Sequence, residues 1–377
     1  MNKLSNHLIL LSSILALSSC GGTPTSTSTS GGQVKEIIDL QNRTVTIDKT
    51  KVDRVICLGA GALRMYSYIG DLSKLVGVEE IDRTTFGVGT ALRPYYLVNQ
   101  DTFKAVPSCG TGGPMDQAPN YEKLIECNPN IIISLYSSKD VNDEISQRLN
   151  IPVVALSSGN NGVYDEATKK SFTLLGDIFS KEARAKELND YISETEAEFA
   201  KLSMSEDNAY VGCIGNWGRT NLYGTYYNFP VLSVAKVKNV VNDLSWPSGA
   251  KQVTIDAEKL AEIDPDRIFL DDAGFSGFIS DYKVNKSKYD ALKAFQNKEI
   301  YGLFPYNAYY INLEIQIMST YYVSSIYHED AFPSFDIAKK ANEVSKKFLG
   351  VENYSDMCKA LTSLDGYGKI NLEAYLD

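Results

Sequence analysis

Histidine is almost absent from this sequence: its 377 residues contain 2, and one of them is His7 near the start. A receptor for bare zinc or manganese normally needs several imidazole ligands, so the composition argues against direct binding of such an ion. A Ser-His-Asp triad could use only His328, and the sequence has no Gly-x-Ser-x-Gly motif. Paired carboxylates for glycoside cleavage stay open, because an acidic chain offers many candidates. We expect that the protein is not an enzyme.

Basic runs, long apolar runs and Cys-x-x-Cys spacings are missing as well. The net charge of −10 without a basic run argues against nucleic acid and anionic lipid headgroups as partners. Beyond Cys20, no stretch approaches the roughly 18 consecutive apolar residues of a membrane-spanning helix. The odd number of later cysteines leaves at least one thiol unpaired within the chain. We expect small buried side chains, while a disulfide and soft-metal ligation by Cys57 and Cys109 stay open; the five are Cys57, Cys109, Cys127, Cys213 and Cys358.

The first 20 residues have the pattern of a secretion signal. Lys3 precedes an apolar core from Leu8 to Leu17, which is too short to span a bilayer as a stable helix. The tetrad Leu-Ser-Ser-Cys ending at Cys20 resembles a bacterial lipobox, which implies a signal peptide of residues 1–19 and lipid on the Cys20 thiol. Residues 20–34 are rich in Gly, Ser and Thr and predict a flexible tether. We therefore expect a domain anchored to the outer face of the bacterial cytoplasmic membrane.

The stretch VICLGAGALRMY has an apolar run, then Gly59-x-Gly61, then a helical pattern. In a dinucleotide-binding turn a third glycine lets the helix pack against the strand, but Arg64 stands there instead. The acidic residues about 20 positions further on, Glu79 and Glu80, fit the ribose-binding position of that motif. Two glycines at a strand-to-helix turn are common in α/β proteins, and free nucleotides are scarce outside the cell. We therefore expect a βαβ unit without a bound nucleotide.

The two halves of the sequence repeat one motif. Residues 121–131 read YEKLIECNPNI and residues 257–267 read AEKLAEIDPDR, so that Glu122 and Glu258 correspond at an interval of 136 residues without a gap. Each motif predicts a helix that stops before proline and leads into a strand. Between the motifs, helix-forming residues continue almost unbroken over residues 166–203. We expect two similar α/β halves joined by a long helical segment, with Gly176 marking a break in it.

The order of these segments resembles a known family. The lipobox, RVICLG, EKLIECNPNIII, NIPVV, EKLAEIDPDRIF and KEIYGLFP together look like the substrate-binding lipoproteins of bacterial ABC transporters for iron-siderophore, haem and cobalamin complexes. The likeness covers most of residues 34–350. It implies an α/β fold of two Rossmann-like lobes with central parallel sheets, joined by one long rigid helix, with the ligand cleft between the lobes. The expected parts are an N-terminal lobe at residues 35–165, a connecting helix at 166–203 and a C-terminal lobe at 204–377 with a terminal helix.

The resemblance also implies the ligand and the partners. We expect a monomer that carries a metal chelate as its transported ligand and has no cofactor or metal of its own. One glutamate on each lobe, matching Glu122 and Glu258, is expected to meet arginines of the importer's permease. Both could instead simply favour the start of a helix, where a carboxylate suits the helix dipole.

Loops after strands are where a ligand is expected in open α/β lobes. The chain has 24 tyrosines, and phenol and indole rings give rigid area with a polar tip, while arginine offers a fork for carboxylates. From these loops we predict nine ligand contacts: Arg93, Tyr95, Trp217, Arg219, Tyr226, Tyr227, Trp246, Asp272 and Tyr306. Alternatives to a chelate receptor are a receptor for an unchelated metal ion or oxyanion, a cleft hydrolase and a passive surface lipoprotein that binds a protein.

Overall fold

The computed structural model describes residues 34–84, 92–113, 119–214, 221–361 and 363–376. The predicted signal peptide, the lipidated Cys20 and most of the tether lie outside these ranges, as do Trp217 and Arg219. None of the helices in the described ranges is long and apolar enough to cross a membrane. Residues 33–377 form one compact unit.

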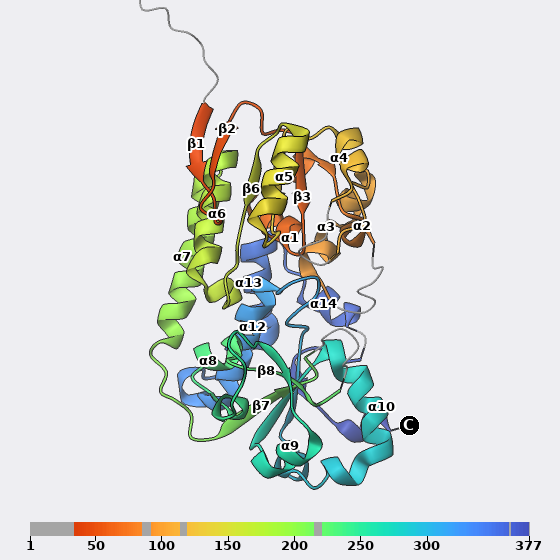
Figure 1. Ribbon diagram of the computed structural model, residues 1–377. Helices are drawn as coiled ribbons and strands as arrows, with labels where there is room; N and C mark the ends of the chain where they lie inside the picture. Colours follow the sequence, from red (N-terminus) through yellow and green to blue (C-terminus); the bar gives the residue numbers. More distant parts are fainter. Residues whose placement is uncertain (1–33, 85–91, 114–118, 215–220, 362, 377) are drawn as a thin grey trace, which may run out of the picture. The chain divides into compact units, whose positions relative to one another are not determined.

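The first sheet, here called the N-terminal sheet, has four parallel strands in the order β4-β3-β5-β6. Its two central strands are buried at every residue, as expected for parallel strands covered on both faces. The strands are β3 (Val55–Leu58), β4 (Leu75–Gly77), β5 (Ile131–Ser134) and β6 (Val153–Ala155). Its helices are α1 (Ala62–Ile69), α2 (Glu80–Arg83), α3 (Pro94–Ala105), α4 (Tyr121–Cys127) and α5 (Lys139–Leu149), and a hairpin of β1 (Val34–Ile38) and β2 (Thr44–Asp48) precedes them (Figure 1).

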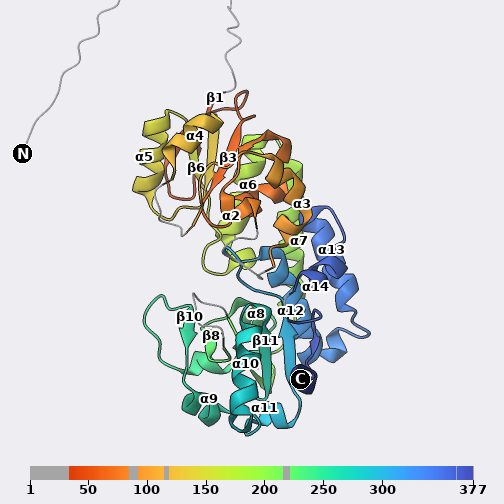
Figure 2. The same cartoon turned by 90° about the vertical axis from the view of Figure 1, so that its right-hand side faces the viewer.

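The second sheet, here called the C-terminal sheet, has the order β13-β12-β11-β7-β9. Its strands are β7 (Asn208–Gly212), β9 (Lys238–Asn239), β11 (Arg267–Asp271), β12 (Ile300–Leu303) and β13 (Gly368–Lys369), with a separate pair of β8 (Gly224–Tyr226) and β10 (Gln252–Thr254). Its helices are α8 (Pro230–Val234), α9 (Ala257–Ile263), α10 (Asp272–Tyr289), α11 (Lys293–Gln296), α12 (Leu313–Tyr327), α13 (Ile337–Leu349) and α14 (Tyr354–Ala360), and Figure 2 shows α10 beside β11.

The C-terminal segment differs from the prediction of a terminal helix alone. It forms the short helix α14 and then β13, which pairs antiparallel with β12 at Tyr301 and Gly302. The segment therefore covers the edge of the C-terminal sheet, where unpaired backbone groups would otherwise face solvent.

The sequence repeat folds into two matching helix-to-strand units. The helices α4 and α9 have 7 residues each and both carry an exposed glutamate, Glu122 or Glu258, in the first turn. Asn120 caps the first helix by accepting from the Lys123 N–H, and Asp256 caps the second in the same way from Lys259. Both helices end on a left-handed residue and lead into a central strand, β5 or β11. The predicted correspondence of the two halves is confirmed at this unit.

The expected long helix is instead a pair of helices, α6 (Glu166–Phe179) and α7 (Glu182–Phe199), packed against each other. The chain turns at Ser180, whose φ of 54° is left-handed, so the predicted break at Gly176 is wrong. Gly176 lies inside α6, at a position where a Cβ would come within 2.6 Å of the Ala185 Cβ. Glycine at this position allows the close crossing of the two helices.

The two sheets share one continuous apolar core. Buried residues from Val55 in the first sheet to Ile300 in the second belong to the same cluster. Although α12 and α13 come late in the chain, they pack against parts that come early (Figure 1). For example, the Phe348 ring of α13 contacts the Tyr68 ring of α1 edge to face at 5.1 Å. The division into lobes at the predicted residue boundaries stays a prediction.

Candidate ligand-binding site

The loop that follows β12, here called the tyrosine loop (residues 304–312), joins the two sheets at the carboxyl ends of their strands. Within it, Tyr309 and Tyr310 have left-handed backbones with φ values of 47° and 84°. Such conformations are unfavourable for a residue with a Cβ and persist only where the surroundings hold them. Both side chains are half-buried, whereas Tyr306 and Ala308 of the same loop are buried.

Tyr310 fills the glycine turn that raised the question of a nucleotide. Gly61 has a φ of 89°, and a Cβ there would lie 2.9 Å from the Tyr310 ring. The Tyr310 hydroxyl accepts a hydrogen bond from the Ser158 Oγ at 3.0 Å, beyond the end of β6. Gly61 therefore makes room for a ring of the chain itself, in the place where a dinucleotide motif would approach its pyrophosphate, while Gly59 lies against Tyr136.

Tyr309 reaches a buried carboxyl group beside the same turn. Its hydroxyl donates to the Glu79 Oε2 at 2.9 Å and accepts from the Gly113 N–H at 3.2 Å. Glu79 also accepts from the Gly59 N–H at 3.2 Å. Burial, with the neighbouring Asp82 carboxylate, raises the pKa of Glu79 to about 8. Glu79 is therefore largely protonated at neutral pH, and its place here is structural, not that of a ribose ligand.

Arg64 binds the tyrosine loop from α1. The side chain is 1% exposed. Its guanidinium donates to the carbonyl oxygens of Ala308 at 2.6 Å and Ile311 at 2.7 Å, and to that of Tyr309 at 3.3 Å. It also lies over the Tyr95 ring, 4.7 Å from the ring centre. Arg64, which departs from the nucleotide motif, thus connects α1 to the tyrosine loop.

The predicted ligand residues Arg93 and Tyr95 lie inside the protein. Arg93 is 3% exposed, and its guanidinium donates to the Ile81 carbonyl at 2.6 Å and pairs with Asp82 at 3.2 Å. Tyr95 is fully buried, and its hydroxyl donates to the same Asp82 carboxylate. These partners use the polar atoms that a ligand would need, so this arrangement does not favour the predicted contacts.

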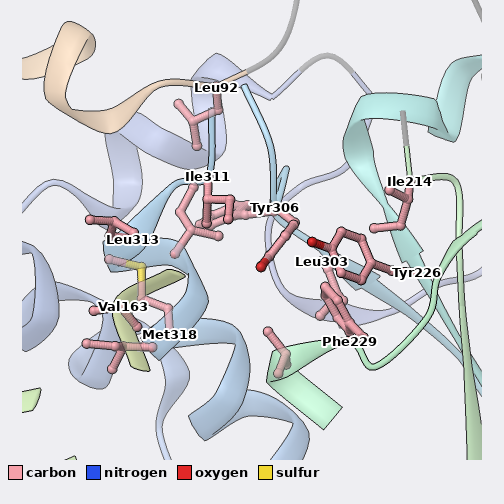
Figure 3. Close-up of a cluster of buried hydrophobic side chains, with 14 of the residues drawn as sticks. Leu92, Val163, Ile214, Tyr226, Phe229, Leu303, Tyr306, Ile311, Leu313 and Met318 are labelled. Carbon is pink, nitrogen blue, oxygen red and sulfur yellow. The ribbon is translucent and has the colours of Figure 1, made fainter. Parts of the chain in front are cut away.

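Tyr226 and Tyr306 come together at the C-terminal sheet, as the prediction requires. Their ring centres are 5.5 Å apart, and Phe229 packs edge to face on Tyr306 at 4.8 Å (Figure 3). Both tyrosines are nearly buried, at 6% and 2% exposure, and their hydroxyls interact with each other. Burial raises the pKa of Tyr226 to about 12, so its hydroxyl remains a neutral donor. Figure 3 shows the pair in one buried cluster with Leu92 and Ile311.

The remaining predicted contacts are spread around the same sheet. Tyr227 is half-buried and adjoins Tyr226. Trp246 is also half-buried and donates its indole N–H to the Val241 carbonyl at 2.9 Å. Asp272 is buried and accepts from the Leu364 N–H at 3.2 Å, which makes it a link to the C-terminal segment. The nine residues predicted from sequence include none of Arg64, Glu79, Tyr309 and Tyr310. Two of these gave a signal in the sequence: Arg64 departs from the nucleotide motif, and Glu79 matches it.

The described cysteines carry no disulfide: four are buried, and Cys358 is half-buried. Burial, with the neighbouring Asp82 carboxylate, raises the pKa of the Cys57 thiol. The described part of the chain contains no group of three or more His, Cys, Asp or Glu side chains placed to hold a metal ion.

Residues 55–306 match the periplasmic binding protein family. The chain belongs to this family. Among its relatives, the high-affinity heme uptake system protein IsdE of Staphylococcus aureus strain MRSA252 is 24% identical over 314 residues, which cover 78% of this chain and 87% of the relative. The crystal structure of a periplasmic solute binding protein from Veillonella parvula aligns with a TM-score of 0.67 at 17% identity, over 87% of this chain and 96% of that one. The molybdate-binding protein MolA of Haemophilus influenzae aligns with a TM-score of 0.63 at 17% identity, over 84% and 98%. This periplasmic binding protein therefore has the fold that its sequence resemblance implied.

Replacing Glu79 by glutamine tests the buried carboxyl group. A carboxyl whose pKa is about 8 when folded and near 4.3 when unfolded destabilises the native state increasingly as pH rises between those values. Relative to Glu79→Gln, the wild type should lose up to about 1 kcal/mol of unfolding free energy per pH unit from about pH 5 to 8. Urea unfolding across this range measures the difference.

The control is Glu194→Gln, at an exposed position of α7. Its pH profile should run parallel to that of the wild type. If the profile of Glu79→Gln is parallel to it as well, Glu79 does not titrate as described.

Proposed function

We propose that this periplasmic binding protein is a receptor that captures a metal chelate outside the cytoplasm and delivers it to an ABC importer. The chelate is an iron-siderophore, haem or corrinoid complex. The observation that carries this proposal is the gathering of tyrosines at the strand ends of a protein whose curated relative belongs to a heme uptake system. Phenol rings offer flat apolar area and neutral donors, which suit a large, partly apolar ligand.

The residues proposed to contact the chelate in this part of the site come from the second half of the chain. We assign Tyr226, Tyr227 and Trp246 to the side of the ligand site formed by the C-terminal half. Trp217 and Arg219 belong to the segment that follows β7 in the sequence. We keep Tyr306 in the proposed site because its ring packs beside that of Tyr226. The buried ion pair of Arg93 with Asp82, and Tyr95 beside it, hold the wall behind the site.

An unchelated oxyanion is the second candidate, because MolA, which shares the fold, is described with bound molybdate. Such a ligand needs a small pocket lined by N–H groups and hydroxyls. The described residues at the strand ends instead present rings, and the arginines there are committed to backbone carbonyls or to Asp82. This chemistry favours the chelate.

The matched helices α4 and α9 are the proposed contact with the importer. Glu122 and Glu258 occupy the same position in two helices of the same length with the same caps, and both side chains are exposed. Two equivalent carboxylates, one beside each sheet, suit a permease built from two membrane subunits with basic side chains. Lipid on Cys20 would hold the receptor at the membrane through the tether.

The first test of this function is direct binding. A soluble form that starts near Gln33 should bind at least one member of a panel of hemin, a ferric hydroxamate, a ferric catecholate and cyanocobalamin, with a Kd of about 1 μM or tighter. Tryptophan quenching or a change in the ligand's absorption spectrum measures it. Binding of molybdate without any chelate would support the oxyanion receptor, and no response to the panel would contradict the proposal.

The second test separates ligand capture from docking. Replacing Glu122 and Glu258 together by lysine should leave chelate binding within about twofold of the wild type and reduce chelate uptake by cells at least tenfold, to roughly the level without receptor. The physical reason is that two attractive contacts with the permease become repulsive.

The matched control reverses two exposed glutamates away from these helices, Glu194 and Glu206. It changes the net charge equally and should leave uptake unchanged. Normal uptake by the Glu122→Lys, Glu258→Lys protein would show that the helices do not dock.

A further inference from the structure

The tyrosine loop is held by groups from several parts of the N-terminal sheet. Glu79 and Gly113 bind the Tyr309 hydroxyl, and Ser158 binds the Tyr310 hydroxyl. The Asn312 side chain adds bonds to the carbonyls of Leu92 at 2.9 Å and Pro305 at 2.8 Å. Glu79 follows β4 and Ser158 follows β6, so the tyrosine loop contacts segments beyond the ends of two strands of the N-terminal sheet.

Arg64 is the one group among these that binds the loop's backbone around the two left-handed residues. Its bonds to the carbonyls of Ala308 and Ile311 flank Tyr309 and Tyr310 on either side. Charged donors give stronger hydrogen bonds than neutral ones, and the planar fork of arginine fixes two acceptors at once. The guanidinium is thus placed to hold the peptide groups in a conformation that tyrosine does not adopt by itself.

The consequence concerns the surface that a ligand meets. In open α/β folds ligands bind at the carboxyl ends of strands, where Tyr309 and Tyr310 cover the turns of the N-terminal sheet. Both residues remain partly exposed, whereas Arg64 is buried. A ligand arriving at this edge would therefore touch tyrosines supplied by the C-terminal part of the chain.

We propose that Tyr309 and Tyr310 form the ligand-contacting wall over the N-terminal sheet, and that Arg64 is the positioning residue that sets their placement before the ligand binds. The proposal rests on the proposed function, because it assigns part of that receptor's site. Preorganisation of a wall lowers the entropy lost on binding, so a defect in Arg64 weakens affinity without removing any atom that the ligand touches.

A purely structural role for Arg64 is the competing explanation, and the chain offers a matched control. Arg184 of α7 also binds three backbone carbonyls from different elements, those of Tyr68 at 2.9 Å, Lys347 at 2.5 Å and Phe348 at 3.1 Å. None of its partners belongs to the tyrosine loop. Arg64→Met and Arg184→Met therefore both remove an arginine that binds three backbone carbonyls, although Arg184 is more exposed and also pairs with Glu187. Only the first substitution acts on the proposed wall.

The experiment measures two quantities for both variants in the soluble form. Hydrogen exchange follows the loop amides of Ala308 and Asn312, which are bonded within the loop at 3.0 Å and 2.9 Å. Titration follows the Kd for whichever of hemin, ferric hydroxamate, ferric catecholate or cyanocobalamin the wild type binds. Arg64→Met should exchange these amides at least about tenfold faster and raise the Kd about tenfold or more, whereas Arg184→Met should change either by less than about twofold.

If Arg64→Met does not fold, the same measurements are made on Arg64→Lys. Lysine keeps the charge but not the fork, so its effects should lie between those of the wild type and the methionine variant. Tyr310→Phe removes only the bond to Ser158 and should raise the Kd by a smaller factor than Arg64→Met.

Each result decides the proposal. Unchanged exchange in the Arg64 variants would show that Arg64 does not position the loop. Faster exchange with an unchanged Kd, or an equal loss of affinity in Arg184→Met, would show that the loop is not a ligand wall. A wild type that binds no chelate would overturn the proposed function itself, which distinguishes that failure from the failure of this inference.

Discussion

The contact between the Arg64 guanidinium and the carbonyls of the tyrosine loop is the constraint on which the proposed ligand site depends. Without it, Tyr309 and Tyr310 would have to keep left-handed backbones against their own steric preference. With it, the carboxyl end of β12 is attached to α1 and to the turns after the first sheet's strands. The continuous apolar core adds a second connection, because α12 begins directly after the loop and packs against early and late parts of the chain.

This attachment changes how the glycine turn is understood. From sequence, Gly59-x-Gly61 raised the question of a nucleotide, and Arg64 spoke against it only as a missing glycine. In the structure, Gly61 leaves room for the Tyr310 ring, and Arg64 binds the loop that carries this ring. A turn that resembles a cofactor motif therefore serves contact between two parts of one chain. The sequence also predicts a ligand cleft with aromatic contacts, but the described tyrosines pack largely against the protein itself.

Local patterns predicted the fold well where the chemistry was local. The helix stops before Pro129 and Pro265 and the strands that follow them depend on neighbouring residues, and they appear as expected. The α6–α7 turn was misplaced because glycine signals either a break or a close crossing, and only the packed partner Ala185 decides which. Site residues were harder to predict. Burial of Arg93 and Tyr95 depends on Asp82 reaching both, and the role of Arg64 depends on a loop more than 240 positions away.

The central claim is that a chelate binds between the strand ends of the two sheets, against tyrosines that are already in place. A crystal structure of the protein with a bound chelate tests this most directly. The account predicts the chelate in contact with Tyr226 on one side and with Tyr309 or Tyr310 on the other, with Arg64 still bound to the carbonyls of Ala308 and Ile311. A chelate bound elsewhere, or one that has displaced the Tyr310 ring from Gly61, would contradict it.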